Sequence, residues 1–326
     1  MIIFVIGALI FSGYLWIHTR RAALVSVSQS QINKVSAVAR QYGLPVANPD
    51  AANKFTVIFY YEGYNSPEEA QHYVGLMQAT LKNVEPFASA SNLQTHVFTS
   101  AIPKCHVRKT VKSLLVCDQS LINEVNQLGY DRFKLVIVSP LNFVPNAKVA
   151  RGKNSALYLS TYQGALTQTE INTFVSRYFM HELGHSLGLR DEYTRQRPTA
   201  AIGDEQTAMA LSSNIAYQPA QPNCAPDEAT AKQWWGAYLT AGVADVGYLR
   251  GCAGRDSYVF PQKGTLMSDD PQIENYGRVS EDYLRGVLSC FYAGKGLVDY
   301  PQGVTAVPGT TSCPDFRRQY PDFWLN

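Results

Sequence analysis

The first half of the chain contains short runs of apolar side chains separated by polar segments with helical spacing. Three of these runs are rich in β-branched and aromatic residues, which is typical of buried strands, and they lie at 54–63, 93–100 and 132–140. A fourth segment, 154–161, alternates apolar and polar side chains, so we expect it to form an edge strand. The pattern therefore predicts four strands in this half of the chain.

Segments with helical periodicity lie between the strands. A helix that begins at an N-cap serine is predicted at 66–81, and another is predicted at 118–129. Strands that alternate with helices indicate an α/β fold, or α+β in its details, with a twisted mixed sheet. After residue 194 the pattern becomes irregular, and helices are predicted only near 227–241 and 279–292.

The longest predicted helix begins at Thr167, which can form a capping box with Glu170. Apolar side chains and histidines then recur at three- and four-residue steps and share one helix face: Ile171, Phe174, Tyr178, His181 and His185. Gly188 ends the helix. The predicted helix therefore has an apolar face that carries two histidines at its end.

Charge and the N-terminal sequence limit the partners of the protein. The chain has 326 residues, of which 28 are basic and 26 acidic, and no charge run indicates a surface for nucleic acid. A mostly apolar run at 2–17 precedes Arg20 and Arg21 and could bring the chain to a membrane.

The predicted parts of the chain are a signal or membrane-anchor segment (1–21), a tether (22–53), an upper catalytic subdomain (54–193) and a lower subdomain (194–326).

Two signals point to different compartments. Basic residues directly after the apolar run would keep the downstream chain inside the cell under the positive-inside rule. Six scattered cysteines without a CxxC pair are instead typical of disulfides in an oxidising compartment. We predict an extracytoplasmic protein, secreted or membrane-anchored, in which cysteines that are neighbours in sequence are bonded: 105 with 117, 224 with 252 and 290 with 313.

The sequence HELGH at 181–185 carries the chemistry of the predicted helix. Histidines four residues apart lie one helical turn apart, so His181 and His185 can bind one metal ion together. Glu182, next to the first histidine, can accept a proton from the attacking water. The motif therefore predicts a zinc site with a carboxylate base.

A third ligand is needed, because catalytic zinc usually has three protein ligands and no histidine follows His185. The long HExxHxxGxxH signature places its third histidine six residues after the second, where this chain has Asp191, and its glycine corresponds to Gly188. A carboxylate oxygen can serve as a zinc ligand. Asp191 is our predicted ligand, and Glu192 is the alternative.

A turn-rich segment, KGTLMSDDP at 263–271, places Met267 where a methionine turn beneath the metal could form. Together with HELGHSLGLRD, this resembles the metzincin clan of zinc endopeptidases, and the aspartate resembles that of snapalysin-type secreted bacterial proteases. The ending GLRDEY and the segment VIFYYEGYNSPEEAQHYVGLMQATLKNVEPF are similar to IgA-peptidase-like metallopeptidases. The likeness covers roughly residues 54–193.

The resemblance implies a metzincin-like fold, with the active-site helix in an upper subdomain and a methionine turn in an irregular lower one. It also implies zinc as cofactor, a protein or peptide substrate, and pairing of substrate backbone with the edge strand at 154–161. Tyr193 and Tyr276 are candidates, by residue type, for a transition-state donor. We expect one more residue before DEY in the IgA-peptidase-like family, which keeps both Asp191 and Glu192 open as the third ligand.

These residues predict a zinc-dependent endopeptidase that hydrolyses peptide bonds with Glu182 as general base. One alternative is a gluzincin-type peptidase whose third ligand is a later glutamate, Glu205 or Glu228; Gly188 argues against it. Another alternative is a non-enzymatic surface or binding protein on a metal-supported peptidase scaffold. The presence of Glu182 argues against that alternative, because a degenerate site commonly loses its base.

Overall fold

The structure is a computed structural model, and it describes residues 54–193 and 223–290 apart from short internal gaps. The gaps lie at 101, 110–112, 129, 131–132, 143–145, 148–153, 163, 165 and 270–273. The predicted segments at 1–21 and 22–53 lie outside the described residues. Within the described part, no helix is both long enough and apolar enough to cross a membrane.

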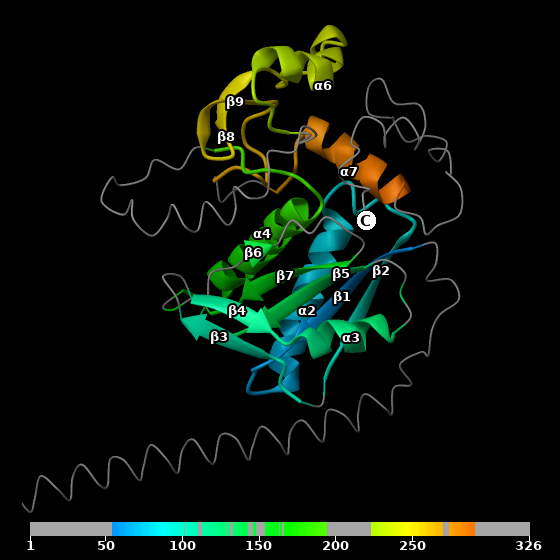
Figure 1. Ribbon diagram of the computed structural model, residues 1–326, viewed down its shortest axis with the longest axis vertical. Coiled ribbons are helices and arrows are strands. Elements are labelled where there is room, and N and C mark those ends of the chain that lie inside the picture. The colour runs from blue at the N-terminus through cyan, green and yellow to red at the C-terminus, as the bar shows by residue number, and fades with distance from the viewer. Residues whose placement is uncertain are drawn as a thin grey trace, which may run out of the picture.

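We call residues 54–193 the upper part and residues 223–290 the lower part, although Figure 1 draws the lower part at the top. A five-stranded sheet forms the centre of the upper part, in the order β2-β1-β5-β7-β6. Three strands lie where the apolar runs predicted them: β1 (Phe55–Tyr61), β2 (Leu93–Phe98) and β5 (Phe133–Ser139). β7 (Asn154–Ser160) pairs in parallel with β5, as β1 does with both of its neighbours. Strands alternate with helices, and the described part is a mixed α/β fold with a mainly parallel sheet.

The prediction that 154–161 forms the edge of the sheet is wrong. β7 pairs with β5 on one side and with the two-residue strand β6 (Asn146–Ala147), which is antiparallel to it, on the other. β6 is too short to give a strand signal in the sequence. The alternation within β7 therefore arises in a strand that neighbours the edge.

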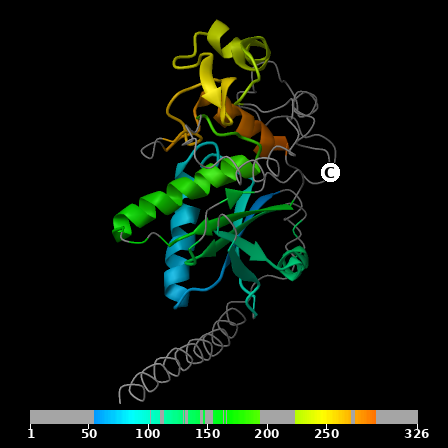
Figure 2. The same cartoon turned by 60° about the vertical axis from the view of Figure 1, so that its left-hand side comes forward.

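Two helices cover one face of the sheet, and α3 with a hairpin covers the other (Figures 1 and 2). α2 (Pro67–Asn83) and α4 (Gln168–Ser186) pack on the first face, and α3 (Gln119–Asn126) packs on the second. Side chains of successive residues in a strand point to opposite faces. Accordingly, Phe59 of β1 faces the α2–α4 side and Ile58 faces the α3 side.

The hairpin on the second face was not predicted from the sequence. It consists of β3 (Cys105–Lys109) and β4 (Ser113–Cys117), which pair antiparallel. The predicted disulfide between Cys105 and Cys117 is present and joins the two strands. The strands are short, and the bond fixes them to each other directly.

Among its described residues, the lower part contains two helices and a second hairpin. α6 (Glu228–Thr240) and α7 (Arg278–Cys290) lie where helices were predicted, whereas the hairpin of β8 (Leu249–Cys252) and β9 (Arg255–Phe260) was not predicted. The predicted disulfide between Cys224 and Cys252 is present. Cys313 of the third predicted pair lies outside the described residues.

α7 connects the lower part to the upper core (Figure 1). Its apolar side chains Tyr283, Leu284 and Val287 belong to the same buried cluster as the residues of α2, α4 and β1. The Tyr283 hydroxyl also donates a hydrogen bond of 2.8 Å to the carbonyl oxygen of Leu187. The end of α4 is therefore enclosed by side chains from both parts of the chain.

Candidate metal centre

The local sequence explains why α4 begins and ends where it does. The capping box is formed: the Glu170 backbone N–H donates to the Thr167 hydroxyl, and the Thr167 N–H donates to the Glu170 carboxylate. At the other end Gly188 has a φ of 102°, a left-handed conformation that favours glycine and that reverses the chain after the helix. The helix therefore ends one residue after His185.

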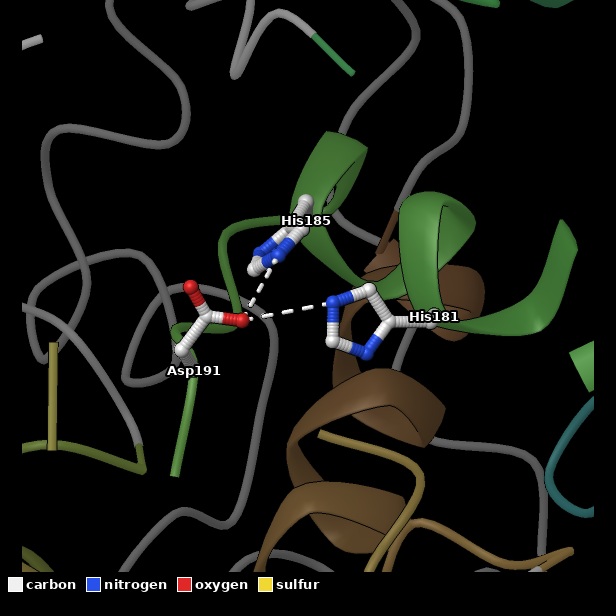
Figure 3. Close-up of side chains that lie close together, drawn as sticks. All are labelled: His181, His185 and Asp191. Atoms are coloured by element: carbon white, nitrogen blue, oxygen red, sulfur yellow. Dashed lines mark ion pairs between the residues drawn. The ribbon is translucent and has the colours of Figure 1, made fainter. Parts of the chain in front are cut away.

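The structure brings His181, His185 and Asp191 together (Figure 3). One ligand atom from each of these residues lies within 4.8 Å of the others. The Asp191 Oδ1 atom is 3.3 Å from His181 Nε2 and 3.2 Å from His185 Nε2. Among the described residues, this is the one group of metal-ligating side chains that converges in this way.

Both imidazole rings are held by backbone carbonyl groups through their other nitrogen. His181 Nδ1 lies 2.7 Å from the carbonyl oxygen of Leu266, and His185 Nδ1 lies 2.9 Å from that of Leu189. A carbonyl oxygen only accepts, so each Nδ1 must carry the proton and donate it. When the rings are neutral, the Nε2 atoms carry the lone pairs and both face Asp191, which is the arrangement usual for metal-binding histidines.

The Asp191 oxygen between the two rings is buried, and no described residue gives it a hydrogen bond of normal geometry. A buried carboxylate oxygen without a donor is costly unless a cation lies beside it. Two imidazole nitrogens and one carboxylate oxygen also match the ligand types that zinc takes in proteins. The three residues present therefore fit a zinc ion.

The charges at the site are strongly coupled. Burial by itself would raise the pKa of the Asp191 carboxyl, but the charge of His185 and the contacts with both rings hold that pKa far below its usual range. Burial by itself would lower the pKa of His185, whereas the Asp191 charge raises it to about 9. Without metal, a proton on His185 thus faces an ionised Asp191. Metal binding would release that proton, because metal ligands bind in their deprotonated forms.

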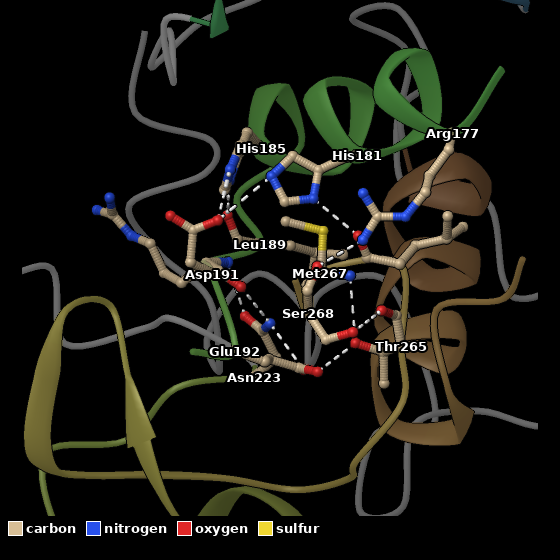
Figure 4. Close-up of polar contacts among 12 residues, drawn as sticks. Arg177, His181, His185, Leu189, Asp191, Glu192, Asn223, Thr265, Met267 and Ser268 are labelled. Carbon is tan, nitrogen blue, oxygen red and sulfur yellow. Dashed lines mark hydrogen bonds and ion pairs between the residues drawn. The ribbon is translucent and has the colours of Figure 1, made fainter. Parts of the chain in front are cut away.

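Glu192, the alternative ligand, lies away from this group and is buried among other partners (Figure 4). Its carboxylate accepts a hydrogen bond of 2.9 Å from Asn223 Nδ2 and a short one from the Thr265 hydroxyl. Burial raises its pKa to about 8, although the two hydrogen bonds oppose that rise. Glu192 thus connects the segment after α4 to the turn that contains Met267.

Met267 lies under the histidines, at the centre of the turn-rich segment (Figure 4). Its side chain is fully buried, and its carbonyl oxygen accepts a hydrogen bond of 2.8 Å from the Glu192 backbone N–H. The Thr265 hydroxyl accepts from the Met267 N–H at 3.2 Å. The turn is also close to the helix, because a Cβ atom added to Gly184 would lie 2.8 Å from Met267 Sδ.

Glu182 follows the first histidine on α4 and is 6% exposed. Its charge contributes, after that of Asp191, to the raised pKa of the His185 ring. Tyr276, a candidate donor by residue type, is fully buried, and its hydroxyl donates to the carbonyl oxygen of Met180. Among the gluzincin candidates, Glu205 lies outside the described residues and Glu228 is exposed in the first turn of α6, outside the metal-ligating group.

Asn223 and Thr265 are residues of this site that sequence reasoning missed. Both are fully buried and polar. Neither belongs to a motif, and Asn223 lies more than thirty residues after α4, so only the folded chain brings them to Glu192. In the sequence, Asn223 stands out only because it directly precedes Cys224, and Thr265 only because it lies in the turn-rich segment at 263–271.

Comparison with known proteins yields little. No family model matches the chain, and no curated protein matches it. Among solved structures, archaemetzincin from Methanopyrus kandleri aligns with 44% of this chain and 78% of its own, at 16% sequence identity and a TM-score of 0.28. A likeness at that TM-score does not identify the fold or the function of this chain.

Proposed function

We propose that the chain is a zinc-dependent endopeptidase in which His181, His185 and Asp191 hold the metal. The observation that carries this proposal is the convergence of both Nε2 atoms on one buried oxygen of Asp191, while both Nδ1 atoms are bonded to carbonyl groups. The burial and hydrogen bonds of Glu192 favour Asp191 over Glu192 as the third ligand.

Each residue has a distinct task in this proposal. When bound, zinc supplies Lewis acidity and lowers the pKa of a water molecule so that it can attack at neutral pH. Glu182 accepts the proton of that water and returns it to the leaving amine. The carbonyl groups of Leu266 and Leu189 hold the two rings in the tautomer that the ligand role requires.

We also propose protein or peptide substrates and an extracytoplasmic location. Disulfides persist in oxidising compartments, and the described residues include the bonds Cys105–Cys117 and Cys224–Cys252. Hydrolysis of peptide bonds is the reaction that a zinc site with an adjacent carboxylate base performs in proteins with the HExxH motif.

The test compares two glutamate-to-glutamine variants in the same helix. Glu182→Gln should keep zinc and melting temperature but lose about 10²- to 10⁴-fold in turnover of a generic unfolded protein, because the water lacks its proton acceptor. Glu170→Gln, at the exposed start of α4, should turn over substrate at the wild-type rate. Near-normal turnover by zinc-loaded Glu182→Gln would remove the base from the mechanism. A zinc-loaded wild type without hydrolysis would favour the binding-protein alternative.

A further inference from the structure

The segment that carries Asp191 is fixed along its backbone by contacts from the lower part of the chain. We call residues 190–193 the ligand loop. Its backbone hydrogen bonds run from Ala253 N–H to Asp191 O at 2.8 Å, from Glu192 N–H to Met267 O at 2.8 Å, and from Gly254 N–H to Tyr193 O at 3.4 Å. A loop whose backbone is bound at three consecutive residues has little freedom to move its carboxylate.

Asn223 makes further contacts with the ligand loop. Its Oδ1 accepts from the Arg190 N–H at 2.9 Å, and its Nδ2 donates to the Arg190 carbonyl oxygen at 2.8 Å. The same amide nitrogen donates to Glu192 Oε1 at 2.9 Å. One fully buried side chain thus binds the residues on both sides of Asp191.

The covalent structure connects these supports to each other. Cys224 follows Asn223 directly and forms a disulfide with Cys252, which directly precedes Ala253. Ala253 has a φ of 51°, a conformation that residues other than glycine seldom adopt, and in it donates to the Asp191 carbonyl. Such conformations persist where the surroundings determine them. The disulfide thus joins the two segments that hold Asp191.

We propose that Asn223 is a positioning residue that holds Asp191 in the geometry for metal binding before the metal arrives. This inference rests on the proposed function, because it assumes that Asp191 is a ligand. Residues that support a ligand without touching the metal change metal affinity typically by 10- to 100-fold. A flexible ligand loop would have to be ordered on binding, and that ordering would weaken the affinity.

The test measures zinc dissociation constants by competition with a chromophoric chelator, with folding checked by circular dichroism on the metal-free protein. Asn223→Ala should weaken zinc binding by about 10- to 100-fold. In an Asp191→Ala background the same change should have less than about a twofold effect, because Asn223 acts through the missing carboxylate. Asn223→Asp keeps the side-chain volume and the acceptor for the Arg190 N–H but loses the donor to Arg190 O and Glu192. It replaces the alanine variant in the test if that variant does not fold.

A matched control is Trp235→Phe. It removes one buried hydrogen bond of the lower part, from Trp235 Nε1 to Gly247 O at 2.9 Å, without touching the ligand loop. Its zinc affinity should stay within about twofold of wild type, because distant sites act independently. If wild type binds zinc and folded Asn223 variants bind it equally well, the inference fails alone. The inference also fails if Asn223→Ala weakens binding equally in both backgrounds. A wild type that binds no zinc would overturn the proposed function as well.

Discussion

Replacing Lys134 by methionine should change how stability depends on pH. Lys134 lies in β5, is fully buried, and donates a hydrogen bond of 2.8 Å to the Ser186 carbonyl oxygen at the end of α4. Burial lowers the pKa of its ammonium from 10.5 to about 7. At about 1.4 kcal/mol per pKa unit, that difference lowers the free energy of unfolding by about 5 kcal/mol at low pH, where the buried ammonium is charged.

The sign follows from proton linkage. Between about pH 7 and 10.5 the unfolded chain binds the Lys134 proton and the folded chain does not, so stability contributed by this group rises with pH in that window. Below pH 7 both states are charged and the full cost of burying the charge remains. Between pH 7 and 9 the free energy of unfolding of wild type should therefore rise by about 2 kcal/mol relative to Lys134→Met.

The assay is urea denaturation of metal-free protein at pH 7 and pH 9. Titrations shared by both proteins cancel in the difference between wild type and Lys134→Met. Lys82→Met, which changes an exposed lysine near the end of α2, is the matched control and should follow wild type. If wild type and Lys134→Met show the same pH dependence, burial does not lower the pKa of the Lys134 ammonium, which would refute the prediction.

Two further predictions concern α4 and are measured as changes in the free energy of unfolding. Gly184→Ala should destabilise by about 1–3 kcal/mol through overpacking, because the new Cβ would lie 2.8 Å from Met267 Sδ and 2.9 Å from Tyr276 Cε1. Gly75→Ala in α2, where a Cβ meets nothing within 4 Å, should instead stabilise by up to about 1 kcal/mol, and equal effects would refute the packing argument. Thr167→Ala should cost about 1 kcal/mol through loss of the cap, and an unchanged midpoint would contradict that role.

Local signals in the sequence predict the elements that have a strong capping signal at each end or a strong burial pattern. α4 has its capping box at one end and a left-handed Gly188 at the other, so both ends were predictable. β1 and β5 are buried on both faces and therefore appear as continuous apolar runs. The spacing from His181 to Asp191 likewise predicted which side chains would converge.

Features that depend on contacts between distant segments were not predictable. The edge of the sheet depends on β6, which is two residues long. Both hairpins, β3–β4 and β8–β9, consist of short strands without a turn signal that we recognised. The burial of Glu192 depends on Asn223 and Thr265, which approach it only after folding, so local sequence predicted Asp191 as the ligand but kept Glu192 as an alternative.

X-ray absorption at the zinc edge distinguishes Asp191 from Glu192 as the residue that completes the proposed metal site. In zinc-loaded Asp191→Cys, a sulfur ligand should appear at about 2.3 Å from the metal, because the new thiolate takes the ligand position. Glu192→Cys, one residue later in the same loop, should show only nitrogen and oxygen ligands. Sulfur at the metal in Glu192→Cys and none in Asp191→Cys would contradict the account and make Glu192 the ligand.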